Sequence, residues 1–151
     1  MRQHYESVSE FCQTKTAWNF NTTKAQLNKL SDVPLNRWSA AYTLPPDKLK
    51  ILTTWPISNY EIQDNRLFTN HTDQVQIDYQ RKLEEAYWSA WFTRYVVAEL
   101  VMRTCRGITG DQPDQDMKDE LKMATDEALF QDAQEQPNVA MLSNDFVDCR
   151  Y

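Results

Sequence analysis

Glycine is scarce in this chain of 151 residues, in which only Gly107 and Gly110 occur. Glycine adopts positive φ angles most readily, so few positions can form tight glycine turns. The chain has no glycine-rich phosphate-binding loop, no Walker motif and no nucleophile elbow. The scarcity therefore argues against nucleotide-binding enzymes that use such loops, and it favours long helices.

Cysteine and histidine are also few. Cys12, Cys105 and Cys149 are odd in number and far apart, which indicates reduced thiols of a cytosolic product rather than a disulfide framework. The two histidines, His4 and His71, have no second histidine, cysteine or carboxylate at the spacing of metal ligands. We therefore expect no metal, no cofactor and no enzymatic activity.

Long apolar runs and clusters of positive charge are missing as well. No stretch approaches the roughly 20 apolar residues of a membrane span, and residues 1–5 lack the core of a signal peptide. We expect no membrane partner and no export. With 22 acidic and 16 basic residues, the net charge is −6. This balance disfavours a sequence-independent grip on nucleic acid, although DNA could still pass nearby without being held.

Negative charge is concentrated between Asp111 and Glu135, where nine acidic residues face only Lys118 and Lys122, a balance of −7. A calcium-binding loop does not fit, because the required central glycine and spaced glutamate are absent. One interpretation is a solvated helix face with acids near the helix N-terminus. The other is an acidic surface that meets a basic partner or lines a channel that must not hold DNA tightly.

The first half of the chain predicts a short helix followed by strands. Helical spacing of apolar residues predicts a helix over residues 2–13, and a β region follows over residues 17–80. Residues 24–30 are also compatible with a helix. Alternating runs on either side of Asp64-Asn65 predict a β-hairpin over residues 60–69. These runs predict a small antiparallel sheet with one buried face.

The last third predicts two helices, over residues 84–106 and 112–135. The first has a broad apolar face that includes Val101, which indicates burial on more than one side. We expect this helix to end near Gly107 and the second to begin with Asp111 as its N-cap. The fold class is therefore α+β: two long C-terminal helices and a short N-terminal helix, with a small antiparallel β-sheet inserted. Residues 1–137 would form one domain, and residues 138–151 an extended tail.

Aromatic residues make up 12% of the chain and include five tryptophans. Such residues either form an aromatic core or supply surface shared with neighbouring subunits. For any single tryptophan the core is favoured, whereas for the whole set we expect some use at an interface. The candidates for a subunit interface are Trp88, Trp91, Phe92 and Tyr95. Stacking on single-stranded nucleic acid would need a basic groove, which is absent.

Several of these features follow one another along the chain in an order that can be compared with known families. A Trp-Asn-Phe segment at residues 18–20 precedes an aromatic run that ends in the Leu-Pro-Pro-Asp corner at residues 44–47. A Tyr-Glu hairpin begins at residue 60, a strand ends at Tyr79, and a long helix and an acidic helix follow. From Trp18 to about Gln136 this order resembles the head-to-tail adaptor (tail tubular protein A) family of short-tailed bacteriophages. Members usually carry another helix before the Trp-Asn-Phe segment, so the resemblance implies a minimal member or a shortened helical bundle.

The resemblance implies a structural protein of the virion, made in the host cytoplasm and located at the portal vertex. Family members form a ring, usually of twelve copies, that binds the portal protein, receives the tail nozzle protein and leaves a channel for double-stranded DNA. Four hairpin residues would face the tail: Tyr60, Ile62, Leu67 and Phe68. Apolar tail residues would dock on the portal or on a neighbouring subunit: Val139, Met141, Leu142, Phe146, Val147 and Tyr151.

Two other functions remain open at this point. Carboxylates are plentiful, so one alternative is a small enzyme that hydrolyses the cell wall and uses two carboxylates as acid and base. A host-directed regulatory protein could instead use its acidic helix to imitate DNA. Neither alternative explains the ordered match to the adaptor pattern.

Overall fold

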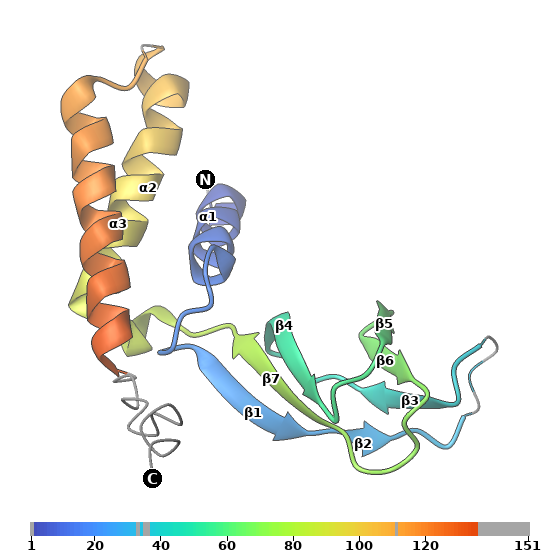
Figure 1. The fold of residues 1–151 in the computed structure, drawn as a ribbon. Helices are drawn as coiled ribbons and strands as arrows, with labels where there is room; N and C mark the ends of the chain where they lie inside the picture. Colours follow the sequence, from blue (N-terminus) through green and yellow to red (C-terminus); the bar gives the residue numbers. More distant parts are fainter. Residues whose placement is uncertain (1, 33, 35–36, 111, 136–151) are drawn as a thin grey trace, which may run out of the picture.

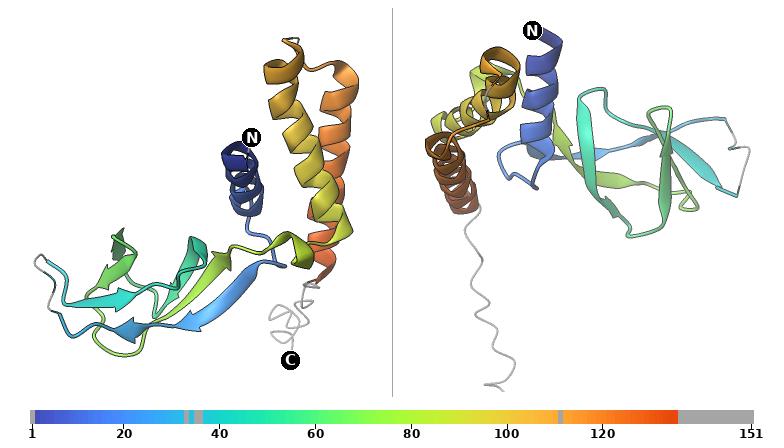
Figure 2. Two further views of the ribbon diagram at one scale, coloured as in Figure 1. Left: turned by 180° about the vertical axis from the view of Figure 1, so that it is seen from behind. Right: turned by 90° about the horizontal axis from the view of Figure 1, so that it is seen from above.

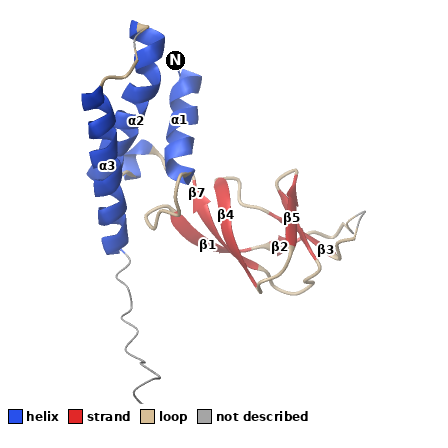
Figure 3. Ribbon diagram, turned by 45° about the horizontal axis from the view of Figure 1, so that its top comes forward, coloured by secondary structure: helices blue, strands red, loops and turns tan. Residues whose placement is uncertain are grey.

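The computed structural model describes residues 2–32, 34, 37–110 and 112–135. Helices gather at one end, and a unit of strands extends sideways from their base, which gives the protein an L shape (Figure 1). Figure 3 shows the same separation of helices from strands. The helices are α1 (Arg2–Thr14), the short 3₁₀ helix η1 (Glu85–Tyr87), α2 (Ala90–Thr109) and α3 (Gln115–Glu135). The predicted α+β class is confirmed.

The three long elements of the helical part lie in a row, with α2 between α1 and α3 (Figure 2). Because α2 has a neighbour on each side, it needs apolar residues over a wide arc, as its sequence predicted. The core between the three helices is aromatic and includes Trp18, Phe92 and Tyr95, with Val8 and Cys12 from α1. Trp18 enters this core from the segment that follows α1.

The β unit consists of two antiparallel sheets rather than the single sheet expected. The first has the order β1-β7-β4 and the second the order β2-β3-β6-β5. The strands are β1 (Thr22–Gln26), β2 (Asn28–Lys29), β3 (Ala40–Thr43), β4 (Lys48–Trp55), β5 (Tyr60–Gln63), β6 (Arg66–Thr69) and β7 (Gln76–Arg81).

Leu27 explains why there are two sheets. It interrupts the extended run of β1 and β2, its N–H group donates to Val75 O at 2.8 Å, and its side chain is buried in the β core. The chain thus pairs first with β7 and then with β3. The β core also contains Tyr42, Leu67 and Ile77. The possible helix over residues 24–30 is therefore wrong.

The predicted hairpin is present. Asp64 and Asn65 have φ angles of 50° and 58°, and they join β5 to β6 in direct register. Two successive positive φ angles match the twist of the flanking strands, and Asp and Asn tolerate them. All four residues of β5 are exposed, and β5 forms the outer edge of its sheet.

The ends of α2 and α3 differ from the predicted ones. Residues 84–89 do not start α2, because Glu84 and Trp88 are extended and the Trp88 indole N–H donates to Leu83 O at 3.2 Å. Helix α2 continues through Gly107 and ends at Gly110, whose φ of 74° permits the left-handed cap. Helix α3 begins after Asp114, because the carboxylate of Asp114 accepts from Met117 N at 2.9 Å.

Buried amides join the helical layer to the β unit. Gln80 on β7 donates to Gln13 O at 3.1 Å and to Thr16 O at 2.7 Å. Asn21 donates to the same Gln13 oxygen at 3.0 Å, and the Gln13 side-chain oxygen accepts from Leu83 N at 2.9 Å. These contacts join the end of α1 and the segment that follows it to β7 and its connections, so this network determines how the two parts meet.

Candidate functional site

The aromatic residues proposed for an interface divide into two groups. Phe92 and Tyr95 are completely buried in the helical core, where both rings pack against Trp18. They serve the protomer's own core, and a subunit interface cannot use them while that core is intact. Trp88 and Trp91 are only partly buried. Of the four aromatic residues predicted for a subunit interface, these two therefore remain candidates.

Two other apolar surfaces lie on the helices, and the sequence pattern did not predict that either is exposed. On α2, Val97, Val101 and Ile108 are 52%, 42% and 73% exposed. On α3, Met123 and Phe130 are 60% and 62% exposed and lie seven residues apart on one face. The periodicity had assigned Val101 to the buried side of α2, which is wrong, because Val101 borders a hollow between α2 and α3 and stays 42% exposed. We call these surfaces the α2 stripe and the α3 stripe.

Between α2 and α3, the α2 stripe borders a hollow of about 340 Å³. Arg94 from α2 crosses to α3, where it donates to Glu120 at 2.9 Å and forms an ion pair with Glu127. The hydrogen bond from Arg94 lowers the pKa of Glu120. Arg94 therefore neutralises part of the acidic helix, whereas Asp116, Asp119 and Asp126 lie on its exposed surface.

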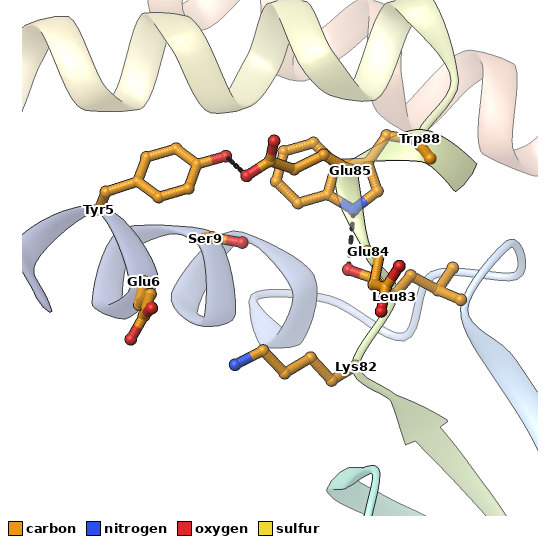
Figure 4. A pocket seen from close by; sticks show the side chains of 9 residues that line it. Tyr5, Glu6, Ser9, Lys82, Leu83, Glu84, Glu85 and Trp88 are labelled. Atoms are coloured by element: carbon orange, nitrogen blue, oxygen red, sulfur yellow. Dashed lines mark hydrogen bonds between the residues drawn. The ribbon is translucent and has the colours of Figure 1, made fainter. Parts of the chain in front are cut away.

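A cleft of about 430 Å³ separates α1 from the connection between β7 and α2 (Figure 4). The Tyr5 hydroxyl crosses it to donate to Glu85 at 2.5 Å, and Trp88 forms part of the wall. Burial, the hydrogen bond to Glu85 and the charge of that carboxylate raise the pKa of Tyr5 to about 12. At the other end, Lys82 pairs with Glu10 at 2.7 Å.

A serine also lines this cleft. Ser9 accepts a hydrogen bond from the side-chain amide of Gln13 at 3.3 Å. No group of three His, Cys, Asp or Glu residues that could hold a metal occurs within residues 2–32, 34, 37–110 and 112–135. The contacts between Tyr5 and Glu85 and between Lys82 and Glu10 instead connect α1 to the chain that leads into α2.

A thiol is buried between α1 and α2. Cys12 has no exposed surface and lies beside Tyr95 and Glu99. Burial, together with the negative charge of Glu99, raises the pKa of Cys12 from 9.0 to about 11. The protonated thiol is therefore the form that the folded protein favours.

This shift predicts a dependence of stability on alkaline pH. Because the folded pKa exceeds the unfolded one, the contribution of Cys12 is complete below pH 9 and is lost as pH rises towards 11. We expect the free energy of unfolding to fall less steeply over this range in Cys12→Ala than in the unsubstituted protein. Urea unfolding followed by circular dichroism at several pH values measures both slopes. Parallel slopes would contradict the prediction, even if Cys12→Ala is less stable at every pH.

The hairpin residues proposed to face a tail also divide. Tyr60 and Ile62 on β5 are 38% and 42% exposed, and Phe68 is half-buried. Leu67 is completely buried in the β core, so it supports the hairpin from inside and cannot contact a partner there. The residues proposed for docking in the tail lie outside the described residues: Val139, Met141, Leu142, Phe146, Val147 and Tyr151.

Comparison with known proteins gives no family to which the chain can be assigned. No protein-family model matches the sequence, and no curated protein matches it at a significant level. Among the helices described, none is both long and apolar enough to cross a membrane. The chain's own residues must therefore support any assignment of function.

Proposed function

We propose that this protein is a head-to-tail adaptor of a short-tailed bacteriophage, a structural component that joins portal and tail in a ring. The observation that carries the proposal is the pair of unlike apolar stripes on α2 and α3. It is supported by the ordered sequence resemblance from the Trp-Asn-Phe segment to the acidic helix. The number of subunits usual in the family, twelve, is the number proposed here.

A closed ring of identical subunits requires two different surfaces on each subunit, because each copy contacts its neighbours head to tail. The α2 stripe is aliphatic and borders the hollow that Arg94 crosses. The α3 stripe combines Met123 and Phe130 with acidic neighbours such as Asp126. Two exposed apolar surfaces of different composition are what such an interface needs, and exposed apolar area tends to mark contact sites.

The L shape suits a protein that connects two partners. The helical layer would contact the portal and the neighbouring subunits, and the β unit would reach the tail nozzle through Tyr60 and Ile62. The exposed carboxylates of α3 would face the channel, where negative charge lets double-stranded DNA pass without specific binding. The role of the tail, residues 138–151, is proposed as docking on the portal or on a neighbour.

Electron microscopy of the portal vertex tests this proposal. Filled capsids assembled without the protein are incubated with the full chain or with a variant that lacks residues 138–151. We expect the full chain to add a ring beneath the portal and the shortened chain to fold but not to dock. Full chain that stays in solution as an unattached monomer, with no density at the vertex, would overturn the proposal.

A further inference from the structure

An open cleft of about 560 Å³ lies in the β unit beside the start of the edge strand β5. Its walls come from the approach to β3, the link from β4 to β5 with the first residue of β5, and the residue after β6. The lining residues are Arg37, Trp38, Ser58, Asn59, Tyr60 and Asn70. Two aromatic rings, two carboxamides, two hydroxyls and a guanidinium thus converge at one place on the surface, and none of these residues belongs to the β core.

Trp38 is held in place by its neighbours. Its indole N–H donates to Glu61 Oε2 at 2.7 Å, and the guanidinium of Arg37 lies 4.9 Å from the centre of its ring. Arg37 also approaches the same Glu61 oxygen at 4.0 Å. An aromatic ring that is fixed before a ligand arrives loses little conformational entropy on binding.

Two polar side chains of the cleft, Asn70 and Ser58, are also held by hydrogen-bonding neighbours. Asn70 Oδ1 accepts from Ser39 N at 3.2 Å and from Ser39 Oγ at 3.3 Å, which orients the carboxamide and leaves its N–H groups as donors. Ser58 Oγ lies 3.2 Å from Thr69 Oγ1. Tyr60 is 38% exposed and offers both a ring face and a hydroxyl.

We propose that this cleft binds a neutral saccharide. Aliphatic C–H groups on one face of a sugar ring pack on an aromatic ring, and its hydroxyl groups exchange hydrogen bonds with carboxamides and hydroxyls. Trp38 and Tyr60 supply the rings, and Asn59 and Asn70 supply amides. The lining of this open cleft is mainly polar, with two aromatic rings among its polar groups, and this mixture matches the many hydroxyl groups and the apolar ring face of a sugar.

Charge distinguishes a saccharide from single-stranded nucleic acid, which also stacks on aromatic rings. Nucleic-acid sites combine stacking with a groove of several cations that follows the phosphates. Among the residues that the structure describes, Arg37 is the one cation that lines this cleft, and Glu61 lies within 4.0 Å of it. The aromatic and amide groups remain effective for an uncharged ligand, whereas a phosphate backbone would lack partners.

Nuclear magnetic resonance of the full chain tests the proposal through the indole N–H signal of Trp38, assigned from Trp38→Phe. N-acetylglucosamine, glucose and galactose are titrated separately, and an oligothymidine is titrated as the rival ligand. We expect at least one sugar to shift the Trp38 signal to saturation. Asn70→Ala should weaken that sugar's affinity by at least about tenfold, a change of about 1.4 kcal/mol.

Trp55→Phe is the matched control, because Trp55 is 49% exposed but does not line the cleft. Its affinity for the sugar should equal that of the unsubstituted protein. The proposal is overturned if no sugar shifts the Trp38 signal, if the oligothymidine alone does so, or if Asn70→Ala and Trp55→Phe behave alike. The saccharide site does not depend on the adaptor function, so either proposal can fail while the other stands.

Discussion

Replacing Trp18 with alanine should lower the free energy of unfolding by about 3–5 kcal/mol, the range for removing a large buried aromatic side chain. Trp18 is 1% exposed, and its ring lies 5.7–6.0 Å from the rings of Phe92, Tyr95 and Trp91. Its indole N–H donates to Cys12 O at 2.8 Å. The substitution therefore removes both ring packing and the partner of a buried carbonyl at the centre of the helical layer.

Urea unfolding followed by circular dichroism measures this loss. Trp55→Ala is the matched control, because Trp55 is 49% exposed and belongs to neither hydrophobic core. Trp55→Ala should lower the free energy of unfolding much less than Trp18→Ala does, by about 1 kcal/mol at most. Equal losses in the two variants would show that Trp18 does not organise the helical core.

Local features of the fold were accessible from the sequence. The hairpin depends on Asp64 and Asn65, neighbouring residues that tolerate positive φ, between alternating runs. The broad apolar face of α2 correctly predicted contacts on two sides. In both cases the residues that determine the structure lie close together in the chain, so a pattern within one segment carries the information.

Predictions failed where a distant segment decides the outcome. Periodicity placed Val101 on a buried face, but α2 and α3 leave a hollow between them at that position, so Val101 stays exposed. Phe92 and Tyr95 are buried because Trp18, more than 70 positions earlier, packs against them. Helix α2 begins later than predicted because the Trp88 indole N–H donates to Leu83 O, a contact that helix propensity does not describe.

The saccharide cleft illustrates the same limit for sites. Trp38 precedes β3, Tyr60 begins β5 and Asn70 follows β6, and no spacing in the sequence links them. Pairing of β3 with β6 and of β6 with β5 brings these connections to one end of the sheet. A motif search could not have found this site, because it is created by the strand order.

Asp132 gives the second large effect that we expect. It lies near the end of α3, is 5% exposed, and accepts from Asn19 N at 2.9 and 2.8 Å through its two oxygens. Phe20 N donates to the same carboxylate at 3.2 Å, and Asn19 Nδ2 donates to Asp132 O at 3.1 Å. The Trp-Asn-Phe segment therefore has two functions in the fold: Trp18 fills the helical core, and the next two residues anchor α3.

Asp132→Ala should lower the free energy of unfolding by about 2–4 kcal/mol, because two backbone N–H groups lose a charged acceptor in a buried place. Hydrogen exchange should accelerate at Asn19 and Phe20 more than elsewhere in the segment. Asp126→Ala removes the same charge from an exposed position of the same helix and should change stability by no more than about 0.5 kcal/mol.

The comparison of these two variants separates contact from charge. If both lose the same stability, the negative charge of α3 matters rather than the bonds to Asn19 and Phe20. If only Asp132→Ala loses stability, the end of α3 is held by a single carboxylate. In that case, loss of the hydrogen bonds to Asp132 should also displace the α3 stripe, because Met123 and Phe130 lie on the helix that Asp132 anchors. A ring interface that uses this stripe would then depend on Asp132, a buried residue that the interface itself never touches.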